Sequence, residues 1–369
     1  MKKIKIPISK PNLTKNDFLE LKKCFDSSWI SSKSPWVEKF EREFAKKVSK
    51  TKYAVAVNSG TSALFLAIKA LSIGPGDEVI LPALTMIATV NAITWVGATP
   101  VLVDSASRND WNINPKQIEK KISKKTKVIL PVHLYGYPCD MDTINKIAKK
   151  NNLYVIEDAA EAMGALYKGK LAGSLSDISC FSLYANKIIT TGNGGMICTD
   201  NKKTSDLLKK LEFFDFNETA HFKHNIIGYN LVLSGLQSSL GYSQIKRFNQ
   251  LLKKRREIFK WYQKNLRDKN VRFIVSPKEN NPNYWFPAII TKTPFLKQKV
   301  IEILSKNGVE TRSFFLPIHL QPVYKSYFEN EKHPIAEYFF ERGLLLPSYY
   351  DLLKSEVWKI CRIINQLAI

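Results

Sequence analysis

Residues 182–195 read SLYANKIITTGNGG, and this stretch decides how the rest of the chain is interpreted. An apolar run at residues 178–181 precedes it, which predicts a strand that leads into a polar turn. The turn holds one lysine, Lys187, followed by glycine-rich backbone. Burial lowers the pKa of a lysine amine, and the neutral amine is the form that attacks a carbonyl group. A lone lysine in a turn is usually a solvated surface residue, so the interpretation depends on what other segments supply.

A serine- and glycine-rich turn follows the first predicted strand. Residues 58–64 read NSGTSAL, and Thr61 and Ser62 stand where a helix is predicted to begin. Free backbone N–H groups at a helix start, with hydroxyls beside them, suit a phosphate group. The same residue types are also common helix caps. Ser182 is a second candidate phosphate ligand, and a solvated turn serine is its alternative.

Acidic residues end another predicted buried strand. Residues 156–161 read IEDAAE. A carboxylate there can hold a pyridine nitrogen in its protonated form, which makes the ring an electron sink. Asp158 is predicted to take that role toward a pyridine cofactor, and Glu161 is predicted to lie near the phenolic oxygen of the same ring. A strand-end acid that caps the next helix is an equally good interpretation of these residues taken alone.

The bulk composition describes an ordinary globular protein with a basic surface. The 369 residues are 44% hydrophobic and 24% charged, and 56 basic against 33 acidic side chains give a net charge of +23. The basic residues are mostly lysines spread over the whole length, whereas clustered arginine with aromatic residues is typical of nucleic-acid binding. We therefore expect no nucleic-acid partner, although a positive field attracts anionic small molecules.

The cysteines and the apolar segments favour a cytoplasmic protein. The five cysteines are far apart and form no CxxC spacing, which argues against a disulfide framework and against a metal site. The first residues, MKKIKIPISK, lack the apolar core of a signal peptide. Residues 79–103 carry no charge and are long enough to span a bilayer, but prolines, a glycine and several threonines interrupt them. A strand, a buried helix and a second strand are predicted there, and no membrane segment.

Strands and helices alternate through the first part of the chain. Short apolar strands are predicted at residues 53–57, 78–81, 100–103, 128–132 and 153–157, separated by helices such as 61–71 and 140–149. This alternation predicts an α/β fold with a largely parallel sheet flanked by helices. Such sheets place their ligands at the carboxyl ends of the strands.

The pattern changes after Gly195. The sequence predicts a long helix at 234–266, a strand at 284–291, a helix at 294–306, a second strand near Val309 and a helix at 353–367. This mixture indicates a smaller C-terminal α+β domain. We place the boundary near Leu240, which divides the chain into a large cofactor-binding domain at 1–240 and the small domain at 241–369.

The phosphate turn, the strand-end aspartate, the serine, the lysine and the glycine turn occur in an order that resembles a known enzyme family. The chain is similar to the sugar-nucleotide aminotransferases of fold type I, the aspartate-aminotransferase fold, which use pyridoxal 5′-phosphate (PLP). The resemblance covers nearly the whole length. Further matching stretches are residues 29–33 (WISSK), 74–79 (GPGDEV), 133–136 (HLYG), 139–141 (CDM), 186–195 (NKIITTGNGG), 228–230 (GYN), 310–312 (ETR) and 346–348 (LPS).

The resemblance implies roles at the cofactor. Lys187 would form the imine with PLP and move protons during catalysis, while Asp158 would hold the pyridine nitrogen and Glu161 would lie near the ring hydroxyl. Met86 stands where relatives usually place an aromatic residue over the ring. The implied phosphate ligands are Thr61, Ser62, Ser182 and, from the other subunit of a homodimer with active sites at the interface, Asn230.

The resemblance also implies a substrate side. Ser31, Arg312 and His319 fall where relatives approach the sugar nucleotide. A structural ion pair is the alternative for Arg312, and a hydrogen-bonded loop position is the alternative for His319.

The implied reaction transfers an amino group from L-glutamate to a nucleotide-linked 4-keto-6-deoxyhexose, while the cofactor alternates between PLP and pyridoxamine phosphate (PMP). The preferred specific reaction converts GDP-4-keto-6-deoxymannose to GDP-perosamine. A UDP- or dTDP-keto-sugar aminotransferase acting at C4 or C3 is the main alternative, because the chain departs from the expected pattern at residues 213–224, 231–233, 313 and 316.

Two readings from other classes are weaker. A sugar 3-dehydratase of the same fold carries histidine at the lysine position, so Lys187 argues against it. A non-catalytic binding or regulatory relative would not need Lys187, Asp158 and Ser182 together.

Overall fold

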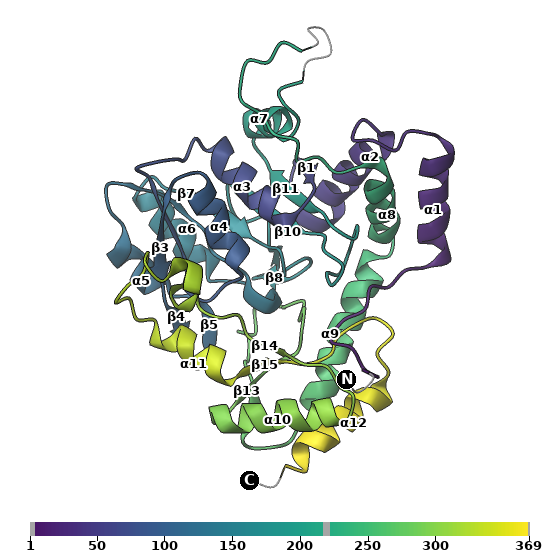
Figure 1. The fold of residues 1–369 in the computed structure, drawn as a ribbon, viewed down its shortest axis with the longest axis vertical. Helices are drawn as coiled ribbons and strands as arrows, with labels where there is room; N and C mark the ends of the chain where they lie inside the picture. Colours follow the sequence, from purple (N-terminus) through teal and green to yellow (C-terminus); the bar gives the residue numbers. More distant parts are fainter. Residues whose placement is uncertain (1–3, 217–221, 368–369) are drawn as a thin grey trace.

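A seven-stranded sheet forms the centre of the molecule. The structure, a computed structural model, describes residues 4–216 and 222–367. In spatial order the strands are β1 (Tyr53–Val57), β11 (Gly195–Thr199), β10 (Ile178–Ser182), β7 (Tyr154–Asp158), β6 (Thr126–Ile129), β2 (Glu78–Pro82) and β3 (Thr99–Val103). Strand β11 runs antiparallel to β1 and β10, and the remaining pairs are parallel. The predicted parallel α/β sheet is therefore confirmed, with β11 as a strand that the sequence analysis did not predict (Figure 1).

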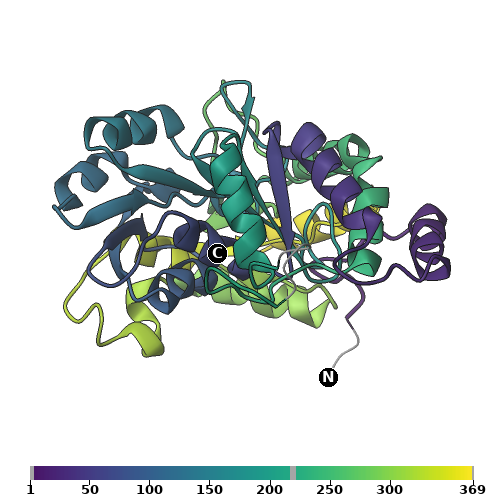
Figure 2. The same cartoon turned by 90° about the horizontal axis from the view of Figure 1, so that it is seen from above.

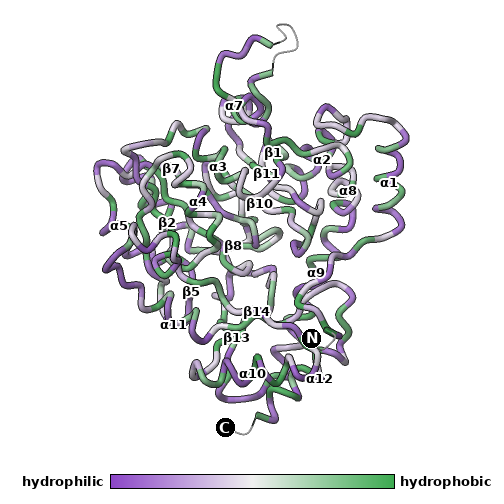
Figure 3. The backbone as a smooth tube through the Cα atoms, viewed as in Figure 1, coloured by the Kyte–Doolittle hydropathy of each residue, from purple (hydrophilic) through white to green (hydrophobic). Residues whose placement is uncertain are grey.

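Helices cover both faces of this sheet (Figure 2). On β2, Val79 and Leu81 join one core cluster, whereas Ile80 joins another on the opposite face. This alternation follows from the two-residue period of a strand. Helices α3 (Gly60–Ala70), α4 (Ile87–Trp95) and α7 (Lys202–Glu212) lie on the first face, and α5 (Pro115–Lys121) and α6 (Met141–Lys150) on the second. Figure 3 shows green, apolar stretches of backbone within this sheet.

Polar caps explain where several helices begin. Ser34 caps α2 (Pro35–Phe44), Asp140 caps α6, and Thr293 caps α10 (Pro294–Lys306), each by accepting a hydrogen bond from a backbone N–H of the first turn. Proline at the first position of α2 and α10 supports the same starts, because proline has no N–H to leave unpaired there. The helix predicted at 294–306 matches α10.

The C-terminal part forms a second sheet. Its order is β12 (Val271–Phe273), β13 (Ala288–Thr291), β15 (Gly343–Leu345) and β14 (Arg312–Ser313), all antiparallel. The predicted strand at 284–291 is too long, because Tyr284 adopts a left-handed conformation with φ of 52° and the strand begins at Ala288. The strand predicted near Val309 is an isolated bridge to Ile6.

The helix predicted over residues 234–266 is two helices. Helix α8 (Gly235–Ile245) and helix α9 (Phe248–Asn265) are separated at Arg247, whose backbone is not helical. The Arg247 guanidinium bonds Asp17 at 2.8 Å and so fixes the break against α1 (Lys15–Asp26). Leu240 falls inside α8, which packs against α1 and α2. The division into residues 1–240 and 241–369 stays a prediction.

The remaining elements connect these layers. They are η1 (Ala45–Ser49), β4 (Ser105–Ser107), β5 (Asp110–Ile113), η2 (Leu134–Gly136), β8 (Leu166–Tyr167), β9 (Lys170–Leu171), η3 (Ile318–Leu320), η4 (Pro322–Tyr324), α11 (Pro334–Arg342) and α12 (Lys354–Asn365). The uncharged run at 79–103 forms β2, α4 and β3, as predicted. Over the described ranges, 4–216 and 222–367, the helices are all too short or too polar to cross a membrane.

An arm leaves the body of the molecule after α7 (Figure 1). We define the arm as the described residues 213–216 and 222–230; residues 217–221 of the divergent segment 213–224 lie outside the described ranges. At its base, Phe213 pairs with Asn230, and Asn58 donates its N–H to the Leu231 carbonyl at 2.8 Å. A Cβ on Gly228 would lie 2.6 Å from the Phe214 Cα, so the two sides of the arm approach too closely for any other residue. The arm is thus anchored beside the start of α3.

Candidate active site

A cavity of about 330 Å³ opens at the carboxyl ends of β7 and β10, and we call it the Lys187 cavity. Its wall combines the start of α3, the turn after β10 and side chains from the C-terminal sheet. Such a position is expected for a ligand site in a parallel α/β sheet. The predicted site residues that line it are Thr61, Met86, Asp158, Glu161, Ser182, Lys187 and Arg312.

The Lys187 amine lies between an acid and an aromatic ring. Its Nζ is 3.7 Å from Oε1 of Glu161 and 3.8 Å from the centroid of the Trp285 ring, and only 10% of the side chain is exposed. Burial lowers the pKa of Lys187, against the opposing attraction of Glu161 and Asp158. A lowered pKa increases the neutral fraction of the amine, which is the nucleophilic form.

The turn around Lys187 is closed by its own backbone. Leu183 donates its N–H to the Gly194 carbonyl, and its own carbonyl accepts the N–H of Thr191. Gly192 turns the chain back with φ of 82°, a conformation that glycine adopts without strain. The glycine-rich tail noted in the sequence therefore returns the chain into β11 beside the lysine.

Asp158 ends β7 at the floor of the cavity. The carboxylate accepts hydrogen bonds from Thr89 Oγ1 at 2.9 Å and from the Ala160 N–H at 3.1 Å. Only 5% of the residue is exposed, and burial raises the pKa of Asp158, in opposition to these hydrogen bonds and to the Lys187 charge. An oriented, buried carboxyl group of this kind fits a heterocyclic nitrogen that carries a proton.

Glu161 is held by a strained residue. Its Oε2 accepts the backbone N–H of Tyr135 at 2.8 Å, and Tyr135 has a left-handed backbone with φ of 54° and ψ of 19°. That conformation costs roughly 1–2 kcal/mol for a residue other than glycine. Burial raises the pKa of Glu161 to about 7, although Lys187 and the Tyr135 N–H act in the other direction. The carboxyl group therefore changes protonation near neutral pH.

Replacing Glu161 by glutamine is expected to make Lys187 more reactive. The carboxylate, ionised above about pH 7, favours the charged amine, so its removal lowers the pKa of Lys187. Acetylation of Lys187 by acetic anhydride in cofactor-free protein, followed by mass spectrometry, should become faster on the order of tenfold at pH 8. Glu212→Gln removes another buried carboxyl group whose pKa is about 7, but one paired with Lys209, and should leave the Lys187 rate unchanged.

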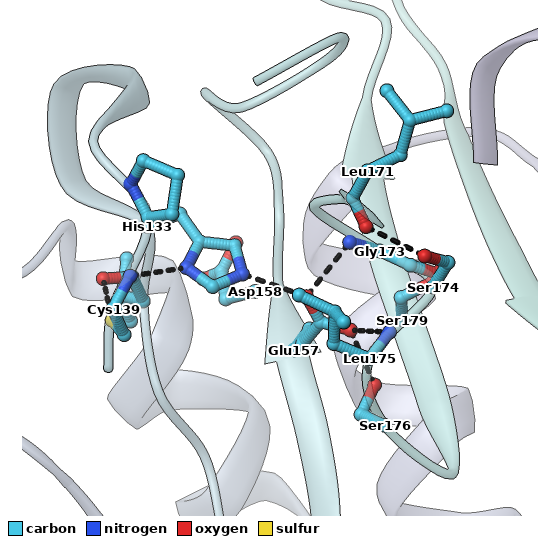
Figure 4. A network of polar contacts seen from close by, with 12 residues as sticks. His133, Cys139, Glu157, Asp158, Leu171, Gly173, Ser174, Leu175, Ser176 and Ser179 are labelled. Carbon is cyan, nitrogen blue, oxygen red and sulfur yellow. Dashed lines mark hydrogen bonds and ion pairs between the residues drawn. The ribbon is translucent and has the colours of Figure 1, made fainter. Parts of the chain in front are cut away.

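A second network of hydrogen bonds holds β7 through Glu157, the residue before Asp158 (Figure 4). The Cys139 N–H donates to Nδ1 of His133 at 3.1 Å, so the ring carries its proton on Nε2 and donates it to Glu157 at 2.7 Å. Glu157 also accepts the Gly173 N–H at 2.7 Å. Burial alone would raise the pKa of Glu157, but the hydrogen bonds from His133 and the backbone outweigh it and the net shift is downward. This buried, fully bonded pair holds the strand that carries Asp158.

The start of α3 provides open donors at the other end of the cavity. Ser59 caps the helix through the N–H of Ser62, whereas the N–H groups of Gly60 and Thr61 have no acceptor among the described residues. A Cβ on Gly60 would lie 3.0 Å from the Ser182 Cβ, so the Ser182 side chain stands directly beside these donors. This arrangement fits a phosphate group.

Some predicted residues lie outside the cavity. Ser62 donates its hydroxyl to Asn58 at 2.6 Å and does not reach the cavity wall. Ser31 is exposed, and Asn230 is exposed at the base of the arm. His319 is buried and bonds Glu337 at 3.0 Å, with its Nδ1 lacking a hydrogen-bond partner among the described residues. The structure of one chain therefore brings Arg312 together with the other predicted cofactor residues, but not with these four.

Other residues of the site were missed by the sequence analysis. Trp285 and Phe315 line the cavity, and Tyr135 stacks on both rings while its hydroxyl accepts the Phe315 N–H at 3.1 Å. Their aromatic character was the only signal in the sequence, and aromatic residues usually fill a core.

Comparison with known proteins identifies relatives over the full length. A model of the DegT/DnrJ/EryC1/StrS aminotransferase family matches residues 11–365. The GDP-perosamine synthase of Escherichia coli O157:H7 is 42% identical over 98% of this chain and 98% of its own length. The GDP-perosamine synthase of Caulobacter vibrioides is 37% identical over 99% of each chain. A Streptococcus pneumoniae protein provisionally described as a sugar aminotransferase, solved in its PLP form, superposes with a TM-score of 0.92 at 28% identity over 98% of this chain and 97% of its own.

Proposed function

The chain belongs to the DegT/DnrJ/EryC1/StrS aminotransferase family of PLP-dependent sugar aminotransferases, and from this premise we propose that it converts GDP-4-keto-6-deoxymannose to GDP-perosamine. L-Glutamate is the proposed amino donor. The observation that carries the proposal is the Lys187 cavity, which combines a buried lysine, a strand-end aspartate and open helix donors in a chain 42% identical to a GDP-perosamine synthase.

The cavity residues fit the cofactor in a defined orientation. The N–H groups of Gly60 and Thr61, with the Ser182 hydroxyl, would hold the phosphate, and Asp158 would hold the ring nitrogen at the opposite end. Met86, a half-exposed cavity residue, offers its thioether to the ring face. When bound, PLP supplies an electron sink that stabilises negative charge on the amino-bearing carbon.

The protein's own contribution is proton handling beside that ring. The Lys187 Nζ is a basic atom that reaches into the cavity, and burial lowers its pKa, which increases the neutral fraction of the amine that can take a proton. Burial raises the pKa of Glu161, 3.7 Å away, to about 7, so this carboxyl group holds or releases a proton near neutral pH. Trp285 covers the amine on its other side and limits the access of water.

Arg312 is the proposed anchor for an anionic part of a substrate. It begins β14, is exposed and lines the cavity, so its guanidinium is available to a carboxylate or a diphosphate. Ser31 and His319 remain predictions for the sugar nucleotide.

Mass spectrometry of products tests the proposed reaction. PLP-loaded protein is incubated with L-glutamate and GDP-4-keto-6-deoxymannose, with UDP- and dTDP-4-keto-6-deoxyglucose in parallel and Lys187→Ala as the control. An amino-sugar product from the GDP substrate alone is expected. Product only from a UDP or dTDP substrate would overturn the substrate assignment while leaving the reaction type, and no product from any of the three would contradict both.

The arm supports a homodimer as the working form. Phe222 and Ile227 on the arm are 84% and 86% exposed, and apolar groups of this size on a projecting segment are typical of a protein interface. The partner we propose is a second copy of this chain, and Asn230, at the base of the arm, would lie at the phosphate end of the neighbouring Lys187 cavity.

Replacing Ile227 by aspartate is expected to weaken this dimer. The change places a charge in an interface that the proposal makes apolar, and it should raise the dimer dissociation constant by about 30-fold or more. Analytical ultracentrifugation measures the shift. Val275, an apolar residue that is 80% exposed elsewhere, provides the control Val275→Asp, which should leave association unchanged. Equal sedimentation of both variants and wild type would remove the arm from the interface.

We also propose a reducing, cytoplasmic environment and the two-domain division at residue 240. All five cysteines are free and buried, which suits a compartment that keeps thiols reduced. The separate core cluster between α9, α10 and α12 supports the small domain.

A further inference from the structure

Arg255 is a buried cation without an acidic partner. It lies on α9 and is 6% exposed, and no carboxylate of the described residues forms an ion pair with it. Its guanidinium donates instead to the backbone carbonyls of Trp285 at 2.9 Å, Asn186 at 3.3 Å and Ser348. Burial lowers the pKa of Arg255 to about 10. Burying an unpaired charge is costly, so a position that keeps one calls for a reason other than stability.

Two of the three carbonyls, those of Asn186 and Trp285, belong to residues that line the Lys187 cavity. Asn186 directly precedes Lys187, and its carbonyl also accepts the indole N–H of Trp285 at 3.0 Å. Arg255 and Trp285 therefore converge on one carbonyl, one residue from the catalytic amine. The Trp285 ring, fixed by this bond and by the Arg255 contact to its own carbonyl, has its face 3.8 Å from the Lys187 Nζ.

Arg256 makes the same kind of hydrogen bond, from a guanidinium to backbone carbonyls, but outside the Lys187 cavity. It is the next residue on α9, and within the described part of the chain it also bonds only carbonyls, those of Gly164 at 2.8 Å, Asn281 at 3.1 Å and Pro282 at 3.1 Å. None of these three residues lines the Lys187 cavity. Both arginines thus bond backbone carbonyls, but only Arg255 bonds the carbonyls of residues that line the Lys187 cavity.

We propose that Arg255 is a positioning residue for the aminotransferase reaction: its fork ties the Asn186 carbonyl, the Trp285 segment and the Ser348 loop together and so seats the Lys187 amine against the Trp285 ring. The planar guanidinium can donate in several directions at once, which a lysine ammonium on a flexible stem cannot reproduce in the same geometry. The inference rests on the role proposed for Lys187.

Several charged groups shift the protonation of the Lys187 amine. Glu161 and Asp158 favour its protonated form, whereas Arg312 and Arg255 disfavour it. Arg255→Met removes one repulsive charge and also lets the amine leave the ring for water, whereas Arg255→Lys keeps a positive charge and removes only the fork that positions the amine. Both changes favour the protonated amine, so they act in the same direction.

The test compares Arg255→Lys and Arg255→Met with Arg256→Lys and Arg256→Met. Acetylation of Lys187 in cofactor-free protein is followed against pH by mass spectrometry. Both Arg255 variants should shift the reaction to higher pH and slow it at least about threefold at pH 8, whereas the Arg256 variants should match wild type. In the PLP-loaded enzyme, the Arg255 variants should lower kcat about tenfold or more and change KM less than about threefold. Arg255 variants that fold and keep the wild-type acetylation profile would overturn the proposal.

A second variant covers the case in which Arg255→Met does not fold. Trp285→Phe keeps a ring over Lys187 but removes the indole N–H that donates to the Asn186 carbonyl. Arg255→Lys disturbs the guanidinium, which is the other donor to the same carbonyl. Each should lower kcat about tenfold with KM nearly unchanged, and wild-type kcat in both would contradict the proposal. Acetylation does not require turnover, so a changed profile together with failure of the keto-sugar experiment would remove only the proposed function.

Discussion

Replacing Lys187 by alanine is expected to lower kcat by about 10⁴-fold or more while the protein stays folded. The amine is the basic atom that the structure places between Glu161 and Trp285, and alanine leaves no group there to carry a proton. The lost side chain is also the predicted covalent anchor of the cofactor. Turnover of GDP-4-keto-6-deoxymannose with L-glutamate measures the loss, and peptide mass spectrometry after borohydride reduction locates the attached cofactor.

Lys297→Ala is the matched control for this variant. Lys297 is a second buried lysine, and burial lowers the pKa of Lys297 to about 8. Its Nζ donates to the Phe340 carbonyl at 2.6 Å, away from the Lys187 cavity. The control should keep near wild-type kcat at a temperature where it remains folded. If Lys187→Ala retained most of the wild-type activity, the proposed mechanism would be contradicted.

Replacing Asp158 by asparagine is expected to lower kcat by roughly 10²–10³-fold. Asparagine keeps the size of the side chain and can still accept the Thr89 hydrogen bond, but it removes the negative charge that would hold a proton on the ring nitrogen. The electron sink then weakens although the cofactor is bound. Steady-state kinetics and the absorption spectrum of the loaded protein provide the two measurements.

Asp104→Asn separates this effect from the general cost of changing a buried strand-end acid. Asp104 follows β3, is 4% exposed and accepts the backbone N–H groups of Ile335 and Ala336 at 3.0 and 2.8 Å. The Asp104→Asn variant should be less stable than wild type, but its kcat should fall much less than that of Asp158→Asn. Equal losses of kcat in the two variants would assign Asp158 a structural role only.

Three residues of the cofactor side, Thr61, Asp158 and Lys187, were predictable because each lies at or shortly after the carboxyl end of a strand. The apolar runs that form β1, β7 and β10 are visible in the sequence, and parallel strands bring their carboxyl ends to one edge. Thr61, Asp158 and Lys187 therefore meet without any further information.

The rest of the site depends on contacts between distant segments. Arg255 and Trp285 both bond the backbone carbonyl of Asn186, which precedes them in the sequence by 69 and 99 positions, and a backbone carbonyl leaves no mark in a sequence. The helix break at Arg247 was missed for the same reason, since its cause is a tertiary bond to Asp17. His319 was assigned to the substrate from the family pattern, whereas in this chain it pairs with Glu337 of α11.

The base of the arm and the phosphate end of the cavity are one piece of backbone. Asn58 donates its N–H to Leu231 and stands two residues before Gly60, whose own N–H is open to a phosphate. In the proposed homodimer, anything that orders this turn orders the arm. Cofactor binding and subunit association are then linked equilibria, and each favours the other by the same free energy. Dilution to monomers should therefore weaken cofactor binding.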